Sequence, residues 1–145
     1  MPYAIVNTAN PNPICASGTD LAIYEAAGKK QLLAERQKIG KIARGDVAVT
    51  GAYQLQAKYI IHTVGPVWED GKQHEFDILE SCYRKSLQKA VELKCESIAF
   101  PLISTGVYGF PKDKALQIAV SVFSEFLTEN EICLLYTSDA ADERS

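Results

Sequence analysis

Two loop segments of this chain contain the residue types that bind an anion and a sugar. The first covers residues 7–20 and carries two asparagines, a stretch of small residues and an aspartate, and the second covers residues 102–111 and carries two glycines. Each segment follows a short apolar run and precedes a helical pattern, which is the strand–loop–helix arrangement of a phosphate site in an α/β domain. Consecutive backbone N–H groups can surround a phosphate, so the two segments predict an anion-binding site.

The polar side chains of the first segment could act on a sugar. Asn7 and Asn10 bracket the end of the first expected strand, and an asparagine amide both donates and accepts hydrogen bonds, as adjacent hydroxyl groups require. Asp20 falls at the start of an expected helix, where the helix macrodipole favours a charged carboxylate that could polarise a water molecule. The structural alternative is that both asparagines only cap the turn and that Asp20 is an ordinary first-turn helix acid.

The second segment offers a row of N–H donors. Ser104–Gly109 lies between an apolar run and Pro111, which precedes a helical pattern at a position where a missing N–H does no harm. Such a segment can form an anion-binding nest. The structural alternative is a plain strand-to-helix turn in which Tyr108 belongs to the core. A single glycine-containing loop is weak evidence, whereas the two loops in this order and at this separation are strong evidence.

These two segments, together with Tyr59-Ile60-Ile61-His62-Thr63-Val64-Gly65-Pro66 between them, resemble the macrodomain family, a module that binds ADP-ribose. The resemblance covers about residues 3–130. It agrees with the alternation of expected strands and helices, which predicts a three-layer α/β/α domain with a mixed, largely parallel central sheet. By position, it implies that Asp20 and Asn10 are catalytic and that the ligand is bound by Asn7, Ser17, Gly18, Thr19, Ser104, Thr105, Gly106, Val107 and Tyr108.

The resemblance also implies an activity, that of the family's hydrolytic branch. This is the removal of ADP-ribose from acidic side chains of modified proteins, or the deacetylation of O-acetyl-ADP-ribose. Asn10 would orient the distal ribose, Asp20 would position the attacking water, and Asn7 would support the loop. No cofactor or metal is expected, because backbone N–H groups meet the charge of the ligand. Two alternatives stay open: a non-catalytic reader of ADP-ribosyl marks that uses the same pocket, and a fragment without a stable fold.

The first loop departs from the family pattern, in which a run of glycines precedes the helix. Cys15, Ala16 and Ser17 stand at the matching positions, and only Gly18 is kept. Alanine and serine adopt positive φ angles at a greater cost than glycine does. We therefore expect this loop to bind a diphosphate less tightly than a glycine run would, and Ala16→Gly with Ser17→Gly to tighten binding.

The ends of the chain differ from the family pattern as well. The strands and the adenine-binding acidic residue that normally come first are missing, and only Tyr136 is available as the aromatic that stacks on adenine. The expected organisation is a macrodomain over residues 1–132, without its N-terminal strands, and an atypical tail over residues 133–145. The tail is either foreign sequence or an ordinary disordered end. We expect weak selectivity for adenine.

Composition bounds the class of protein. A chain of 145 residues, 47% hydrophobic, fits one domain with a core, and a net charge of −3 gives no basic surface for nonspecific nucleic-acid binding. The four cysteines show no CxxC spacing, which predicts reduced thiols. No signal peptide or membrane-spanning apolar run is present. We expect a cytoplasmic monomer whose partner is ADP-ribose or an ADP-ribosylated protein.

Apolar periodicity predicts the elements that position the loops. Thr19 is expected to cap the first helix and Gly28 to end it. Strands are expected at Tyr3–Asn7, Asp46–Thr50, Lys58–Thr63 and Ser97–Leu102, and helices at Asp20–Ala27, Lys29–Lys38, Asp77–Lys94 and Lys112–Leu127.

Other chemistry-bearing residues favour structural interpretations. His62 lies in a β-branched run, so we predict a buried histidine bonded to the backbone rather than a catalytic base, and His74 is expected to be solvated. Cys15 lies near the expected diphosphate but is interpreted as a small loop residue. The basic cluster over Lys29–Arg44 is interpreted as a solvated face, with contact to an acidic protein or nucleic acid as the alternative.

Overall fold

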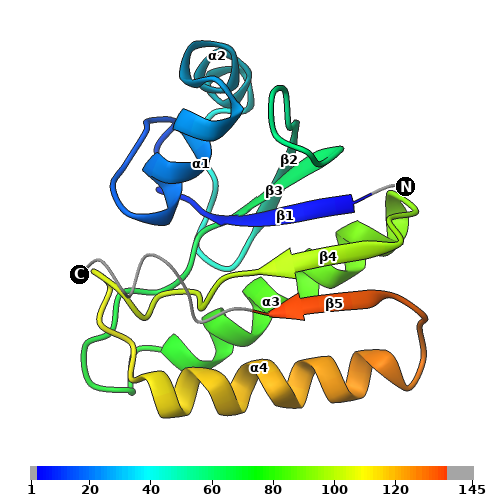
Figure 1. Ribbon diagram of the computed structural model, residues 1–145. Coiled ribbons are helices and arrows are strands. Elements are labelled where there is room, and N and C mark those ends of the chain that lie inside the picture. The colour runs from blue at the N-terminus through cyan, green and yellow to red at the C-terminus, as the bar shows by residue number, and fades with distance from the viewer. Residues whose placement is uncertain (1–2, 137–145) are drawn as a thin grey trace.

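The computed structural model describes residues 3–136, which form five strands and four helices (Figure 1). In chain order the elements are β1 (Tyr3–Thr8), α1 (Thr19–Ala27), α2 (Lys29–Ile39), β2 (Val47–Gly51), β3 (Tyr59–Thr63), α3 (Glu75–Glu92), β4 (Ser97–Phe100), α4 (Lys112–Leu127) and β5 (Cys133–Tyr136). The predicted bounds of α4 are confirmed, and the other predicted bounds differ by up to two residues, as element ends commonly do.

The five strands form one sheet between two layers of helices. The strand order is β2-β3-β1-β4-β5, in which only β2 runs antiparallel to its neighbour. Helices α1 and α2 lie on one side of the sheet, and α3 and α4 lie on the other (Figure 1). The predicted three-layer arrangement with a mixed, largely parallel sheet is confirmed.

The central strand β1 contributes side chains to both faces of the sheet. Ala4 and Val6 pack into the core beneath α3 and α4, whereas Ile5 packs toward the core of α1 and α2. Successive side chains of a strand point to opposite faces, so Asn7 shares the α1 side with Ile5. Asn7 is fully buried there, which places a polar side chain directly under the first helix.

The start of α1 differs from the prediction. Thr19 is the first helical residue, and the N-cap position falls on Gly18, with φ 67° and ψ −133° and no side-chain cap. L-residues rarely adopt such a conformation, so glycine is required here. Gly28, with φ 110°, ends α1 as predicted and also precedes α2.

Parallel pairing brings three loops to one edge of the sheet. Strands β3, β1 and β4 lie side by side and run in the same direction, so the loops that follow them begin at the same edge. These loops cover residues 9–18, 64–74 and 101–111. Ligands of open α/β sheets bind at the carboxyl ends of such strands, where the chain order switches direction.

The C-terminal segment enters the sheet. Residues 133–136, which we assigned to the tail, form β5 and pair in parallel with β4, from Ser97 opposite Cys133 to Phe100 opposite Tyr136. Residues 137–145 and the side chain of Tyr136 lie outside the described part of the chain, as do residues 1–2. Over the described range, no helix is both long and apolar enough to cross a membrane.

Candidate functional site

Asp20 ties the first loop to the central strand. Its side chain, 2% exposed, lies in the first turn of α1. The Asp20 Oδ1 atom accepts a hydrogen bond of 2.7 Å from Nδ2 of Asn7, and Oδ2 accepts one of 2.6 Å from the backbone N–H of Ala16. The carboxylate therefore holds β1 and the first loop against the start of α1.

The pKa of the Asp20 carboxyl shifts in the opposite direction from the one that the helix macrodipole predicts. Burial raises the pKa of the Asp20 carboxyl above its usual value, while the hydrogen bonds from Asn7 and Ala16 and the charge of Arg36 act to lower it. The helix macrodipole was expected to hold this carboxylate in its charged form. Desolvation has a larger effect on this pKa than the groups that lower it, so the net shift is upward.

Asn7 is joined to a buried histidine. Its Nδ2 atom lies 3.0 Å from Nδ1 of His62 on β3, and Nε2 of His62 lies 2.9 Å from the hydroxyl of Thr50 on β2. His62 is fully buried, as predicted, but its partners are side chains and not the backbone. Burial, with a smaller effect of the charge on Arg36, lowers the pKa of His62 to about 3, so the imidazole is neutral at physiological pH.

The second catalytic candidate, Asn10, lies in a loop held by Arg36 of α2. The Nη2 atom of Arg36 is 2.9 Å from the carbonyl oxygen of Asn10, 3.3 Å from that of Pro11 and 3.4 Å from that of Asn12, and Nη1 bonds the carbonyl of Gly40. A guanidinium has five donors in a rigid fork, so one side chain can hold a whole loop turn.

The interpretation of the Lys29–Arg44 cluster as a solvated face is wrong for Arg36. Arg36 is 1% exposed. The preceding residue, Glu35, accepts hydrogen bonds from the N–H of Gly51 and the hydroxyl of Tyr53. No local spacing in the sequence distinguishes Arg36 from the surrounding lysines, because its partners in the first loop lie more than 20 residues away.

The side chain of Asn10 makes the turn that the structural alternative predicts. Its Oδ1 atom accepts a 2.9 Å hydrogen bond from the N–H of Asn12. Within the described residues, the Nδ2 atom of Asn10 has no hydrogen-bond partner, and the side chain is half-buried. A donor thus remains for a ligand while the acceptor shapes the loop.

The small residues before α1 do not carry the strain that the sequence suggested. Of residues 15–18, only Gly18 has a positive φ. Ala16 and Ser17 therefore form this loop without glycine-like backbone angles. Ser17, Gly18 and Thr19 lie consecutively at the N-terminal end of α1, where N–H groups have no intrahelical acceptor. Ser17 and Gly18 are exposed.

The second loop contains a strained, buried serine. Ser104 adopts φ 68°, is 6% exposed, and its Oγ atom is buried without a hydrogen-bond partner in the described structure. Its carbonyl oxygen accepts a 2.9 Å bond from the N–H of Phe110. A Cβ atom at Gly65 would collide with the Ser104 side chain, so glycine at position 65 makes room for it. Such strain is concentrated at functional sites of proteins.

The tip of the second loop faces solvent. Val107 is 88% exposed, Gly106 is exposed, and Thr105 is buried at 8%. Tyr108 is half-buried rather than part of the core, and the guanidinium of Arg44 lies 5.3 Å from its ring centroid. Arg44 also donates a 2.7 Å bond to the carbonyl of Gly65. The sequence pattern places Arg44 in the solvated basic cluster and does not predict these two contacts.

A third loop, between β3 and α3, braces the second. The N–H of Trp68 donates a 2.8 Å bond to the carbonyl of Tyr108, and the Trp68 ring meets Phe76 and Phe110 edge-on, with centroids 5.6 Å and 5.0 Å away. Tyr83 of α3 accepts a 3.2 Å bond from the N–H of Ile103 through its hydroxyl. These contacts link the second and third loops to the helices.

Glu75 holds the third loop. Its carboxylate accepts hydrogen bonds from the N–H groups of Glu69, Asp70, Gly71 and Gln73, at 2.6–3.1 Å. Burial opposes the charged form, but the backbone N–H donors outweigh burial and lower the pKa of Glu75 to about 2. The Asp-Gly turn was recognised in the sequence, whereas the carboxylate that organises it was not.

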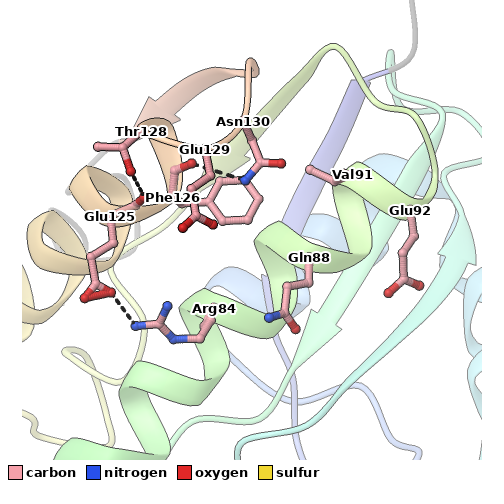
Figure 2. Close-up of a pocket in the computed structure, with 9 residues that line it drawn as sticks. All are labelled: Arg84, Gln88, Val91, Glu92, Glu125, Phe126, Thr128, Glu129 and Asn130. Carbon is pink, nitrogen blue, oxygen red and sulfur yellow. Dashed lines mark hydrogen bonds and ion pairs between the residues drawn. The ribbon is translucent and has the colours of Figure 1, made fainter.

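A separate groove lies between α3 and α4. Figure 2 shows this groove, which has a volume of about 520 Å³ and is lined by Arg84, Gln88, Val91, Glu92, Glu125, Phe126, Thr128, Glu129 and Asn130. The loop of residues 101–111 enters α4 at its N-terminal end, whereas Thr128 follows its C-terminal end. The helix has 16 residues and is about 24 Å long. The groove and the loops are therefore distinct places on the molecule.

Comparison with known proteins gives consistent matches. The family model described as "Macro domain" matches residues 6–119. A macro domain-containing protein of Methanosarcina mazei is 52% identical over 129 residues, covering 89% of this chain and 68% of the relative. An O-acetyl-ADP-ribose deacetylase of Citrobacter rodentium is 45% identical over 128 residues, covering 86% and 72%. The solved Trypanosoma brucei macrodomain in complex with ADP-ribose has a TM-score of 0.85 at 36% identity, covering 97% of this chain and 60% of that one.

Proposed function

Because the chain belongs to the macro domain family, we propose that it binds ADP-ribose at the edge where the loops after β1 and β4 meet, and hydrolyses ADP-ribosyl esters there. The ester is that of an ADP-ribosylated aspartate or glutamate in a protein, or of O-acetyl-ADP-ribose. Relatives named as deacetylases at about 45% identity support the second substrate class.

The observation that carries this proposal is the placement of two N–H-rich loops at the carboxyl ends of adjacent parallel strands. The first leads into α1 through Gly18, where free N–H groups and the helix macrodipole favour a phosphate. The second, over Ser104–Tyr108, is proposed to enclose the other phosphate and the distal ribose. Backbone donors of this kind neutralise a diphosphate without a metal.

The proposed chemistry places Asn10 and Asp20 at the distal ribose. The free Nδ2 of Asn10 donates to a ribose hydroxyl. Each Asp20 oxygen has accepted one hydrogen bond from the protein, and a carboxylate oxygen has a second lone pair that can hold a water molecule. In the reaction on a modified protein, that water attacks the anomeric carbon. The bond from this carbon to the ester oxygen breaks, the carboxylate of the protein side chain leaves, and Asp20 takes up the proton released by the water.

A second candidate function is a non-catalytic reader of ADP-ribosyl marks. It is favoured by the contacts of Asp20, since a carboxylate that already bonds Asn7 and Ala16 has a sufficient structural reason to be present. In that case the same loops bind ADP-ribose and Asp20 only anchors them.

Two measurements on the whole chain test the proposal. Calorimetric titration compares ADP-ribose with AMP and NAD, and the loops predict preference for ADP-ribose because AMP lacks the distal ribose. Equal or tighter binding of AMP contradicts the proposed site. Release of ADP-ribose from a glutamate-modified protein, and of acetate from O-acetyl-ADP-ribose, then separates hydrolysis from reading. Binding without release of either product supports the reader.

A further inference from the structure

A continuous row of hydrogen-bonded side chains crosses the sheet beneath α1. It starts at Thr50 on β2, passes through His62 on β3 and Asn7 on β1, and ends at Asp20 in α1. Asn7 and His62 stand opposite each other in the parallel register of the two strands. All four side chains are buried, at 0–2% exposure. Three strands therefore supply one polar group each to a line that ends at the proposed water-binding carboxylate.

The direction of every hydrogen bond in this row follows from its ends. Ionised Asp20 can only accept, so the Asn7 amide presents its nitrogen to Asp20 Oδ1 at 2.7 Å. The same nitrogen lies 3.0 Å from Nδ1 of His62, so Nδ1 must be the bare, accepting nitrogen. The proton of the neutral imidazole then sits on Nε2 and is donated to the Thr50 hydroxyl at 2.9 Å. That hydroxyl in turn donates to the carbonyl of Gly51 at 3.0 Å.

The opposite arrangement is unfavourable at each step. With the proton on Nδ1, His62 would face the N–H of Asn7 donor to donor. Rotation of the Asn7 amide would relieve this contact but would point Oδ1 at the Asp20 carboxylate, acceptor to acceptor. With Asp20 ionised, the first arrangement pairs each donor with an acceptor along the row and leaves only Asn7 Oδ1 of these side chains without a partner among the described residues. The opposite arrangement sets donor against donor or acceptor against acceptor, which is costly in a buried place.

We propose that His62 is a positioning residue of the site: by presenting an unprotonated Nδ1 to Asn7, and being held in that tautomer by Thr50, it fixes the Asn7 amide and thereby the orientation of the Asp20 carboxylate. His62 has no exposed surface, so its role is to position other side chains and not to contact a bound ligand. This inference rests on the proposed hydrolysis at Asp20, and it assigns a function to a histidine that the reaction itself does not use.

Paired substitutions separate this role from simple core packing. In His62→Asn the side-chain oxygen stands near the position of Nδ1 and can still accept from Asn7, whereas His62→Gln reaches toward Thr50 and leaves Asn7 without this acceptor. Likewise, Thr50→Ser keeps the acceptor that holds the Nε2–H tautomer, whereas Thr50→Val removes it at similar volume. His74→Asn, at an 82% exposed histidine with a left-handed backbone that asparagine tolerates, is the control.

The measurements are the turnover number for ester hydrolysis, the Kd for ADP-ribose and the melting temperature of each variant. We expect His62→Gln and Thr50→Val to lower turnover about 10- to 100-fold, the effect of losing one hydrogen bond that orients a charged group. Their Kd should change less than about threefold, and His62→Asn and Thr50→Ser should recover most of the lost turnover. Turnover that follows melting temperature alone across all variants overturns the proposal.

A spectroscopic readout does not depend on activity. Nitrogen-15 NMR of the imidazole in the wild-type protein should show His62 neutral at pH 7, with the proton on Nε2 and a bare Nδ1. Thr50→Val should shift the signal toward the other tautomer. A proton on Nδ1 in the wild-type protein overturns the inference, whatever the activity. A protein with the expected tautomer that binds ADP-ribose but hydrolyses no ester contradicts the proposed function instead.

Discussion

Asp20 is the residue in which loop anchoring and the proposed chemistry coincide. Asp20→Asn keeps the shape of the side chain and an oxygen that can accept from Asn7, but it removes the charge and the acceptor for the N–H of Ala16. We expect ester hydrolysis to fall about 10²–10⁴-fold, the usual contribution of a positioned acid or base, and ADP-ribose affinity to change less than tenfold. Single-turnover kinetics and calorimetry measure the two effects. Hydrolysis at the wild-type rate in this variant would leave Asp20 as an anchor only.

Gly18 is the residue whose backbone the first loop depends on. Its φ of 67° and ψ of −133° are strained for an alanine, at a cost of about 1–3 kcal/mol. Gly18→Ala should lower the free energy of unfolding by this amount and weaken ADP-ribose binding, because the N–H groups at the start of α1 shift. Urea denaturation and titration measure both.

Gly40 is a matched control for Gly18, with φ 81° and ψ −148° and open space where an added Cβ atom would stand. Gly40→Ala should lower stability to a similar extent while ADP-ribose affinity is retained. Equal loss of affinity in both variants would show that Gly18 acts only through stability. The tighter ADP-ribose binding expected for Ala16→Gly with Ser17→Gly stays a prediction, although neither residue has a positive φ in the structure.

At the scale of the elements, each loop is held by a side chain from a helix behind it. Arg36 of α2 holds residues 10–12, and Tyr83 of α3 holds Ile103. Glu75 at the start of α3 holds residues 69–73. The loops at the candidate site are therefore positioned by the packed layers and not by their own sequence alone.

Arg36→Met tests this support. Methionine fills much of the space of the aliphatic stem but leaves the carbonyl oxygens of Asn10, Pro11 and Asn12 without their donor. We expect a loss of about 2–4 kcal/mol in the free energy of unfolding, because hydrogen bonds to a charged group are lost in a buried place. ADP-ribose should also bind more weakly, since Asn10 is no longer held.

Lys38→Met on the exposed face of the same helix is the control for this substitution. It should leave both the stability measured by urea denaturation and the affinity measured by calorimetry close to the wild-type values. If Arg36→Met behaves like Lys38→Met, the loop does not need the guanidinium.

The elements themselves could be predicted from the sequence. The apolar stripe of α4 and the position of Pro111 determine that helix, and the β-branched run at Tyr59–Thr63 forms β3. Local periodicity was sufficient in these cases, because α4 buries one apolar stripe and β3 is buried along nearly its whole length. The supports of the loops could not be predicted, because Arg36 and Glu75 look like any charged surface residue until distant backbone groups are placed around them.

At the scale of the whole molecule, two buried groups make stability depend on pH. The pKa of His62 falls from 6.5 to about 3 on folding, so the unfolded chain takes up a proton that the native state excludes. The free energy of unfolding should therefore decrease as the pH falls from 6.5 toward 3. Glu75, with a pKa lowered from 4.5 to about 2, adds a decrease between those values.

Urea denaturation at a series of pH values measures this dependence. Since carboxylates also take up protons as the pH falls, the informative quantity is the difference between the wild type and His62→Asn. That difference should shrink as the pH falls from about 6.5 to about 4.5, because only the wild type loses the contribution of His62 in this interval. A difference that is constant over the interval contradicts a buried neutral His62.

The placement of the two loops of the candidate site could be predicted, since strand–loop–helix order puts them at one edge of a parallel sheet. The row of hydrogen-bonded side chains beneath α1 could not be predicted in the same way. His62, Thr50 and Asn7 meet only because β2, β3 and β1 are neighbours in a given register. A sequence shows each of these polar residues inside an apolar strand but not which of them face one another.

The most direct test of the account is to map ADP-ribose binding onto the backbone by NMR. Titration of the protein with ADP-ribose should shift the amide signals of Gly18, Thr19 and the Thr105–Tyr108 segment most strongly. The signals of Gln88 and Asn130, in the groove between α3 and α4, should not move (Figure 2). Shifts confined to that groove, or an absence of shifts in both loops at saturating ADP-ribose, would contradict the proposed site.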